Sequence, residues 1–96
     1  MRLLIHELAF EEFLEALEEI GHFSPRAADD FSGAFIAAAR DVAEHPFSDR
    51  PVGRYRERIM GRFNRRFLYL VDEKMGEIWI MHLLSSVSSK STVSQD

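Results

Sequence analysis

The residues best equipped for chemistry in this sequence are arginines crowded into one short segment. Residues 50–66 hold seven arginines and a single glutamate, a local charge of +6, although the whole 96-residue chain carries −4. A guanidinium stays charged at physiological pH and offers planar, paired hydrogen bonds to phosphates and carboxylates. Because a partner responds to local charge more than to the total, the segment predicts contact with an anionic group. The arginines assigned to this surface are Arg54, Arg56, Arg58, Arg62, Arg65 and Arg66.

Three of these arginines stand at every second position, as residues on one face of a strand do. Arg54, Arg56 and Arg58 alternate with other residue types, and side chains two apart in a strand project to the same side. Like charges side by side repel each other, so the pattern favours a surface that receives an anion or an acidic partner. The alternative is a solvated face in which some arginines pair with the acidic helix expected earlier in the chain.

One histidine has the properties of a proton-transfer group. The ordinary pKa of histidine lies near neutrality, so His82 could act as a general acid or base. The alternative is structural, because Ile78 and Ile80 would share its strand face and leave it half-buried. The other three histidines lack ligand spacing and the chain has no cysteine, so neither a metal site nor a cofactor is expected.

The first half of the chain predicts one strand and two helices. Residues 2–6 are a short apolar run typical of a strand, and residues 7–21 carry apolar positions at helical spacing against a face of glutamates. A second helix begins where Ser24 supplies an N-cap and Pro25 a first-turn proline, and it ends near Pro46. The apolar stripes comprise Phe10, Phe13, Leu14, Leu17 and Ile20 in the first helix and Phe31, Phe35, Ala38, Ala39 and Val42 in the second.

The second half of the chain changes to a period of two, which indicates strands. After a loop at 46–51, an alternating strand is expected at 54–59 and an aromatic, branched strand at 65–71, joined as a hairpin through 61–64. An almost wholly apolar strand at 77–84 follows and is expected to be central in the sheet. The predicted fold class is α+β, with the order β-α-α-β-β-β and a helical hairpin packed on a small, mainly antiparallel sheet.

Length and composition limit the chain to one small domain, placed at residues 1–86. The Ser-rich residues 87–96 offer too little apolar surface to become ordered and are expected to form a disordered tail. The absence of cysteine is typical of a reducing, cytoplasmic protein. No apolar stretch approaches the roughly 18 residues of a membrane span, and the N-terminal apolar run is interrupted too early for a signal peptide, so neither secretion nor membrane insertion is expected.

Several phrases of the sequence occur in an order and spacing that a known family shares. They are SPRAADDF at 24–31, EHPF at 44–47, RYRERI at 54–59, RRFLYLVDE at 65–73 and IWIMH at 78–82. Together with the order of elements they resemble the RelE/ParE superfamily of bacterial toxins, over residues 1 to about 86. The family commonly has an arginine, apolar residues and a tyrosine in the middle phrase, and it ends the last strand with histidine.

The resemblance implies a toxin that a cognate antitoxin protein neutralises, with one of two mechanisms. RelE-like members cleave ribosome-bound messenger RNA without a metal, and their basic residues hold the phosphate and stabilise developing charge. On this chain the corresponding catalytic set would be Arg56, Arg58, Arg66 and His82. ParE-like members inhibit DNA gyrase and need only a binding surface.

The ParE-like function is the first expectation. Ribonuclease members carry further basic residues, and often a tyrosine, just after the last strand, where this chain reads LLSSVSSKSTVSQD. The first 49 residues also carry −8, which is unsuited to approaching RNA. We therefore expect a noncatalytic toxin that acts on gyrase in the cytoplasm, with apolar anchors of the antitoxin in the groove between the helical hairpin and the sheet. The alternatives are the ribonuclease and a degenerate module that binds antitoxin without toxicity.

Overall fold

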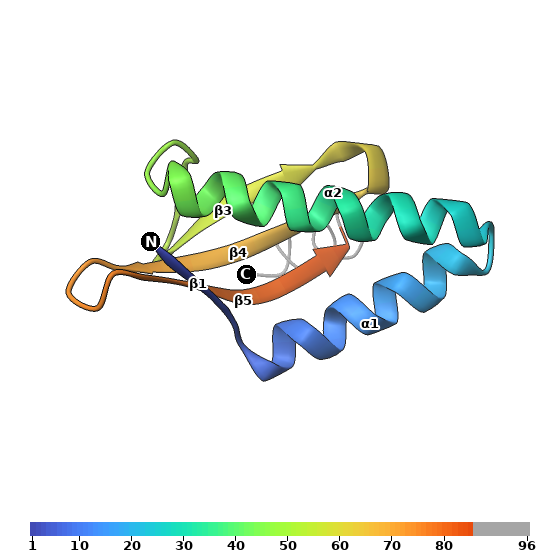
Figure 1. Cartoon of the computed structure of the whole chain (residues 1–96), viewed down its shortest axis with the longest axis horizontal. Coiled ribbons are helices and arrows are strands. Elements are labelled where there is room, and N and C mark those ends of the chain that lie inside the picture. Colours follow the sequence, from blue (N-terminus) through green and yellow to red (C-terminus); the bar gives the residue numbers. More distant parts are fainter. Residues whose placement is uncertain (86–96) are drawn as a thin grey trace.

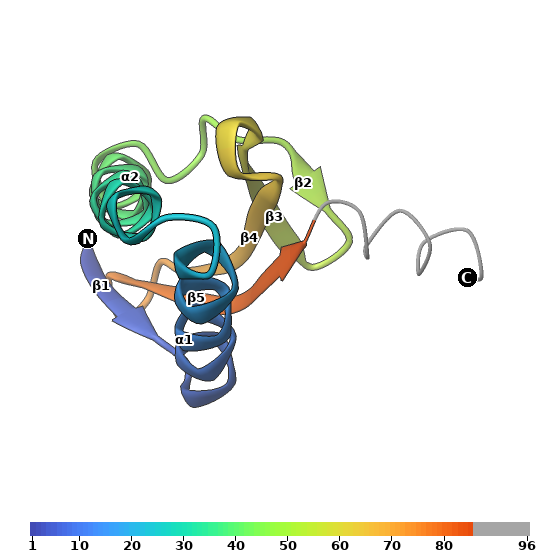
Figure 2. The same ribbon diagram turned by 90° about the vertical axis from the view of Figure 1, so that its right-hand side faces the viewer.

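The computed structural model describes residues 1–85, which form a five-stranded sheet with two helices against one of its faces (Figure 1). The elements are β1 (Arg2–Ile5), α1 (Glu7–Gly21), α2 (Pro25–Glu44), β2 (Pro51–Val52), β3 (Tyr55–Met60), the 3-10 turn η1 (Gly61–Phe63), β4 (Arg65–Asp72) and β5 (Glu77–Ser85). Figure 2 shows the same fold turned by 90°, with α2 seen end-on and α1 overlapping β5. Buried residues of both helices belong to one core with the same face of the sheet. The predicted α+β class and order of elements are confirmed, with one further short strand, β2.

The sheet has the order β1-β5-β4-β3-β2. Strand β1 runs parallel to β5 and every other neighbour is antiparallel, which confirms a mainly antiparallel sheet. The expectation that the 77–84 strand is central holds only in part, because β5 has a partner on each side but β4 is the middle strand. The loop expected at 46–51 ends one residue earlier, since Pro51 already belongs to β2. A strand of two residues is too short to produce a periodic signal.

Helix α2 begins as its capping residues predict, whereas α1 has a cap that the sequence pattern does not predict. The Ser24 hydroxyl accepts a hydrogen bond from the Ala27 amide at 3.2 Å, and Pro25 is the first residue of α2. At the start of α1 the cap is His6, whose Nδ1 accepts from the Leu8 amide at 3.1 Å. Histidine is not among the preferred N-cap residues, so the sequence pattern did not predict this role.

The core lies between α2 and the sheet, with α1 closing one side. Phe35 of α2 packs edge-on against Phe67 of β4, with ring centroids 5.4 Å apart. The stripe predicted for α2 is confirmed, whereas α1 contributes mainly small buried residues such as Ala9 and Ala16. Phe10 and Leu14, which the helical pattern assigns to the buried side of α1, are each 48% exposed. Phe10 lines a groove that is described below.

A bulge in β5 changes which side chains face the helices. Leu68 pairs with His82 and Tyr69 with Ile80, so Met81 is the extra residue. Beyond this point the alternation shifts by one position, and Leu83 instead of His82 joins Ile80 in the core. The prediction that His82 shares the face of the two core isoleucines of β5 is therefore wrong, because strict alternation does not survive a bulge.

The remaining expectations concern the ends of the chain and the membrane. The predicted tail at residues 87–96 lies outside the described residues. None of the described helices is long and apolar enough to cross a membrane.

Candidate functional site

The sheet divides the arginine segment between its two faces. Directly paired residues of neighbouring antiparallel strands lie on the same side. Arg56 and Arg58 pair with the buried Tyr69 and Phe67, so both point to the side that carries the helices. Arg54 belongs to the turn between β2 and β3, so the expectation of three arginines in one strand is wrong for this residue.

Two further strand arginines continue this division. Arg65 pairs with Met60, a core residue, and so points to the helix side. Arg66 pairs with the 60% exposed Ile59 and points to the opposite side, which we call the open face. The six predicted arginines therefore do not form one continuous stripe.

Arg58 is held by two carboxylates of its own chain. Its Nε lies 3.0 and 3.1 Å from the two carboxylate oxygens of Asp49, and its Nη2 lies 2.8 Å from Asp41 at the end of α2. Burial alone would lower the pKa of Arg58, but these carboxylates outweigh it and raise the pKa. Asp49 also accepts a hydrogen bond from the Tyr69 hydroxyl at 2.8 Å. This cluster anchors the loop before β2 to the sheet and the helix.

Alkaline pH is expected to weaken the fold through Tyr69. Burial, followed by the hydrogen bond and the charge of Asp49, raises the pKa of the Tyr69 hydroxyl far above its ordinary value. The folded state therefore holds this proton more tightly than the unfolded state does. The resulting stability is fully present below about pH 10 and is lost as the pH rises towards the folded pKa.

Urea unfolding of the natural protein and of Tyr69→Phe, measured from about pH 8 to about pH 11, checks this expectation. The variant should be less stable by about 1 kcal/mol at the lower pH, because it lacks the hydroxyl hydrogen bond. The two stabilities should converge as the pH rises. A constant difference over the whole range would contradict the proposed role of the hydroxyl.

Arg56 and Arg54 surround a small cavity at the end of the sheet. Arg56 donates to the backbone carbonyl of Asp49 at 2.6 Å, and its guanidinium lies 5.1 Å from the ring centroid of Phe47. Arg54 is exposed and lies over the Tyr55 ring at 5.5 Å. The cavity between them has a volume of about 240 Å³. Within residues 1–85 Arg54 makes no ion pair, so its charge is available to an outside group.

On the open face, Arg66 is neutralised by the one acidic residue of the arginine segment. Glu57 is only 6% exposed at its side chain and accepts from Arg66 at 2.5 Å and from Arg50 at 3.1 Å. Burial alone would raise the pKa of Glu57, but the hydrogen bonds and charges of the two arginines outweigh it and lower the pKa. The sequence offers a signal for this role, since Glu57 is the single carboxylate among seven arginines.

The remaining two arginines reach the helices. Arg65 lies 3.5 Å from Glu19 of α1, and Arg62 lies 3.2 Å from Asp30 of α2. Pairing with the acidic first helix, the alternative considered from the sequence, thus occurs for Arg65. The other carboxylate partners come from α2, the loop before β2 and the sheet itself.

His82 is remote from the arginines of the helix side. It lies on the open face with its ring edge-on to Tyr55 at 5.8 Å, and its Nδ1 is 3.7 Å from a carboxylate oxygen of Glu12. The same Glu12 oxygen accepts the Leu83 amide at 3.0 Å, next to the bulge. Of the four residues predicted as a catalytic set, His82 and Arg66 share the open face, whereas the other two arginines point to the opposite side.

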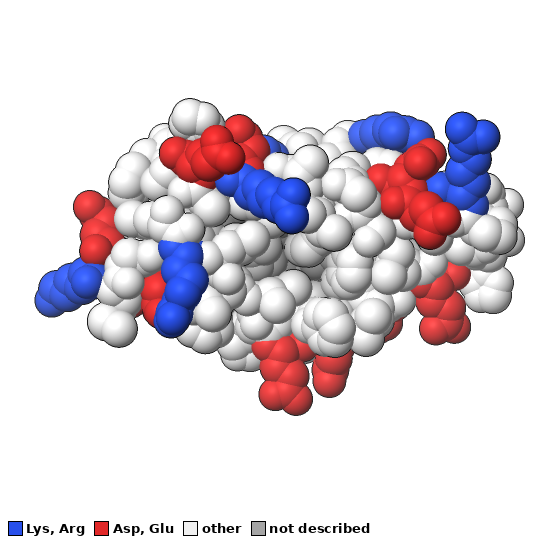
Figure 3. Space-filling view, viewed as in Figure 1, with Lys and Arg blue, Asp and Glu red and all other residues white. Residues whose placement is uncertain are grey.

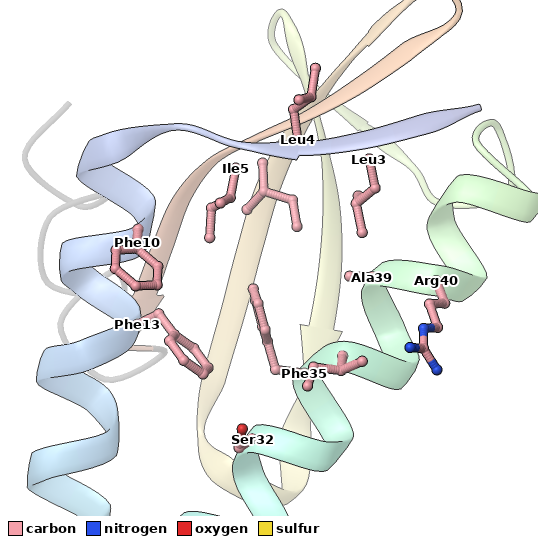
Figure 4. Close-up of a pocket in the computed structure, with 11 residues that line it drawn as sticks. Leu3, Leu4, Ile5, Phe10, Phe13, Ser32, Phe35, Ala39 and Arg40 are labelled. Carbon is pink, nitrogen blue, oxygen red and sulfur yellow. The ribbon is translucent and has the colours of Figure 1, made fainter.

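An apolar groove opens between the two helices and the edge of the sheet, and apolar anchors of an antitoxin were predicted for the groove between the helical hairpin and the sheet. It has a volume of about 430 Å³ and lies between α1, α2 and β1 (Figure 4). In Figure 3 this region is white and hollowed, and charged side chains lie around its margin. Phe10 and Ile36 on its walls are 48% and 45% exposed. The lining residues are Leu3, Leu4, Ile5, Phe10, Phe13, Ser32, Phe35, Ile36, Ala39, Arg40 and Ile80.

The open face carries a second apolar surface. Leu70 pairs there with Trp79, and Leu84 pairs with Arg66. These three apolar side chains are partly exposed, whereas Leu68, which pairs with His82, is only 8% exposed. Ile59 is 60% exposed at one side of this surface. A sheet face that meets only water normally carries polar residues, and these partly exposed apolar side chains depart from that pattern.

A comparison of the chain with protein-family models found no match, and neither did a search of curated proteins. The resemblance to RelE/ParE toxins therefore stays a prediction from the sequence phrases and the order of elements. The structure contributes the distribution of charged and apolar groups over the surface.

Proposed function

We propose that this protein is the toxin of a type II toxin–antitoxin pair, which a cognate antitoxin neutralises and which inhibits DNA gyrase by binding. The observation that supports binding over catalysis is that arginines of the predicted catalytic set are already paired with carboxylates. Arg58 and Arg66 are each held by carboxylates of the chain, and they point to opposite faces of the sheet. Within residues 1–85, the apolar groove between the helices is left uncovered instead.

Cleavage of RNA would require these groups to act together on one phosphate. A general acid or base must lie within hydrogen-bond reach of the reacting atoms, and the cations must surround the phosphate. Here a phosphate would have to displace Asp41 and Asp49 from Arg58, and it would still lie across the sheet from His82. The arrangement therefore favours a binding protein.

The groove between the helices is the proposed antitoxin site. Its floor and walls are almost wholly apolar, and several of the lining side chains are about half exposed in the chain alone. Covering them by a partner's apolar side chains would remove this surface from water, which is the main driving force of protein association. The open face, together with the exposed Arg54, is the proposed contact for gyrase.

The test is to express the chain from a tightly repressed promoter in a bacterial host. If growth stops, translated messages are mapped for cleavage, and the purified protein is added to a gyrase supercoiling assay. Blocked supercoiling with intact messages is the expected result. Cleaved messages would replace the proposal with the ribonuclease, and undisturbed growth would indicate a module that has lost toxicity.

Substitution of His82 by alanine is expected to weaken growth arrest and supercoiling inhibition by no more than about 10-fold, because His82 would be one contact of the open face and a binding toxin needs no proton transfer. The readout is the protein concentration that halves supercoiling. Under the ribonuclease alternative the same substitution should reduce activity by about 100-fold or more. Tyr55→Leu, which removes the ring that contacts His82, is the matched control for a packing effect on the open face.

A further inference from the structure

The groove between the helices contains a single charged side chain. Figure 4 shows its 11 lining residues, of which Arg40 alone is charged and Ser32 is polar. Arg40 projects from α2 at the edge of the groove and is exposed. Its aliphatic stem can extend the apolar wall while its guanidinium stays at the rim.

Arg40 differs from most arginines of this chain because it has no acidic partner in the described part. Within residues 1–85 it makes neither an ion pair nor a side-chain hydrogen bond. The arginines that are bound to carboxylates are Arg2, Arg50, Arg58, Arg62, Arg65 and Arg66. An unpaired guanidinium beside an uncovered apolar groove is complementary to a segment that is both apolar and acidic.

We propose that Arg40 selects the partner of the groove by charge: the occupant is an amphipathic segment of another protein whose apolar side chains fill the groove and whose carboxylate pairs with Arg40. This inference rests on the proposed function for the identity of that protein, the antitoxin, and adds the chemistry by which it is recognised. A carboxylate suits the site because it accepts two parallel hydrogen bonds from a guanidinium. The apolar neighbours exclude water from one side of the pair and strengthen it.

A second copy of the chain is a poorer occupant of the groove. In a two-fold symmetric contact the same surface meets itself, so the two Arg40 side chains would be brought towards each other. Neither groove offers a carboxylate to offset that repulsion, because the other lining residues are uncharged. The charge of the rim therefore favours a different protein.

The experiment selects binding partners from a library of random peptides displayed on phage, with the immobilised full-length chain as the target. The expected peptides share an apolar pattern and an aspartate or glutamate at one common position. Ile36→Glu, placed on the half-exposed wall of the groove, should abolish their binding. Selection against Arg40→Glu should instead enrich lysine or arginine at that common position.

Affinities of the selected acidic peptide complete the test. Arg40→Glu should weaken binding by about 10-fold or more, as expected for a charge-assisted hydrogen-bonded pair, and Arg40→Lys should retain part of it. The matched control is Arg26→Glu, which reverses an exposed arginine of the same helix outside the groove and should change affinity by less than about twofold. Circular dichroism of each variant verifies that it is folded.

Four results would overturn the inference. The selected peptides could lack a shared acidic position, or the selection could yield no peptides that Ile36→Glu blocks. Arg26→Glu and Arg40→Glu could weaken binding equally, or the chain could be a dimer that Ile36→Glu converts to a monomer, which would make a second copy the occupant. The selection needs no toxicity. A chain that arrests no growth but selects acidic peptides would therefore contradict the proposed function and leave the role of Arg40 intact.

Discussion

Substitution of Glu57 by alanine is expected to lower the free energy of unfolding by about 3 to 5 kcal/mol. The side chain of Glu57 is 6% exposed and that of Arg66 is 14% exposed. Removal of the carboxylate leaves the buried guanidinium without its counter-charge, and the Nε of Arg66 already has no hydrogen-bond partner within residues 1–85. Urea unfolding followed by circular dichroism measures the loss.

Two controls separate the buried pair from general effects of charge. Glu73→Ala removes a carboxylate from an exposed turn and should change stability by no more than about 0.5 kcal/mol. The double variant Glu57→Leu with Arg66→Leu removes both charges and should recover much of the loss, because apolar residues can replace a buried ion pair at little cost. A Glu57→Ala loss no larger than that of Glu73→Ala would show that the pair is solvated.

Because of the Glu57 carboxylate, the stability of the fold is also expected to fall at acid pH. Because the folded pKa of Glu57 is lowered, its contribution is present above the ordinary value of about 4.3 and is lost as the pH falls through the folded pKa. Glu57→Gln should therefore lose less stability on acidification than the natural protein does.

Substitution of Phe31 by alanine is expected to cost about 3 to 5 kcal/mol, the usual range for a truncated core phenylalanine. Phe31 is fully buried, and its ring contacts those of Phe13 at 5.8 Å and Phe63 at 5.2 Å. Phe31 therefore packs α2 against α1 and η1, and alanine would leave a cavity in place of these contacts. The midpoint of urea unfolding at constant slope measures the effect.

Phe23→Ala is the matched control for this change, because the same residue type is 90% exposed there. It should alter stability by no more than about 0.5 kcal/mol. If the two phenylalanine variants had similar stabilities, the helical hairpin would not be packed as described.

Much of the fold followed from local spacing. The helical stripe of α2 and its Ser24 cap, the alternation of β3 and the aromatic, branched run of β4 depend on neighbours within a few residues, and the structure contains each of these elements. The elements that escaped prediction have no such signal. Strand β2 has two residues, and the His6 cap uses a side chain that rarely serves there.

The site was less predictable, because it depends on pairings between distant segments. A period of two assigns Arg56 and Arg58 to one face, but it cannot say that Asp41 and Asp49 will occupy Arg58. Asp41 comes from a helix and Asp49 from a loop, and only packing brings both to β3. The carboxylate partners in the sheet and the helices therefore had to be found in three dimensions.

The sequence alone predicted the order of helices and strands, the capping of α2 and the concentration of arginines, because periodicity, propensity and charge are properties of neighbouring residues. The tertiary structure decided which face each arginine takes and moved His82 to the open face through a one-residue bulge. It also left Phe10 48% exposed on the wall of the groove that Arg40 borders, although helical spacing would bury it. Strand register and the angle between packed helices are set by contacts between distant segments, and a periodic pattern carries no information about them.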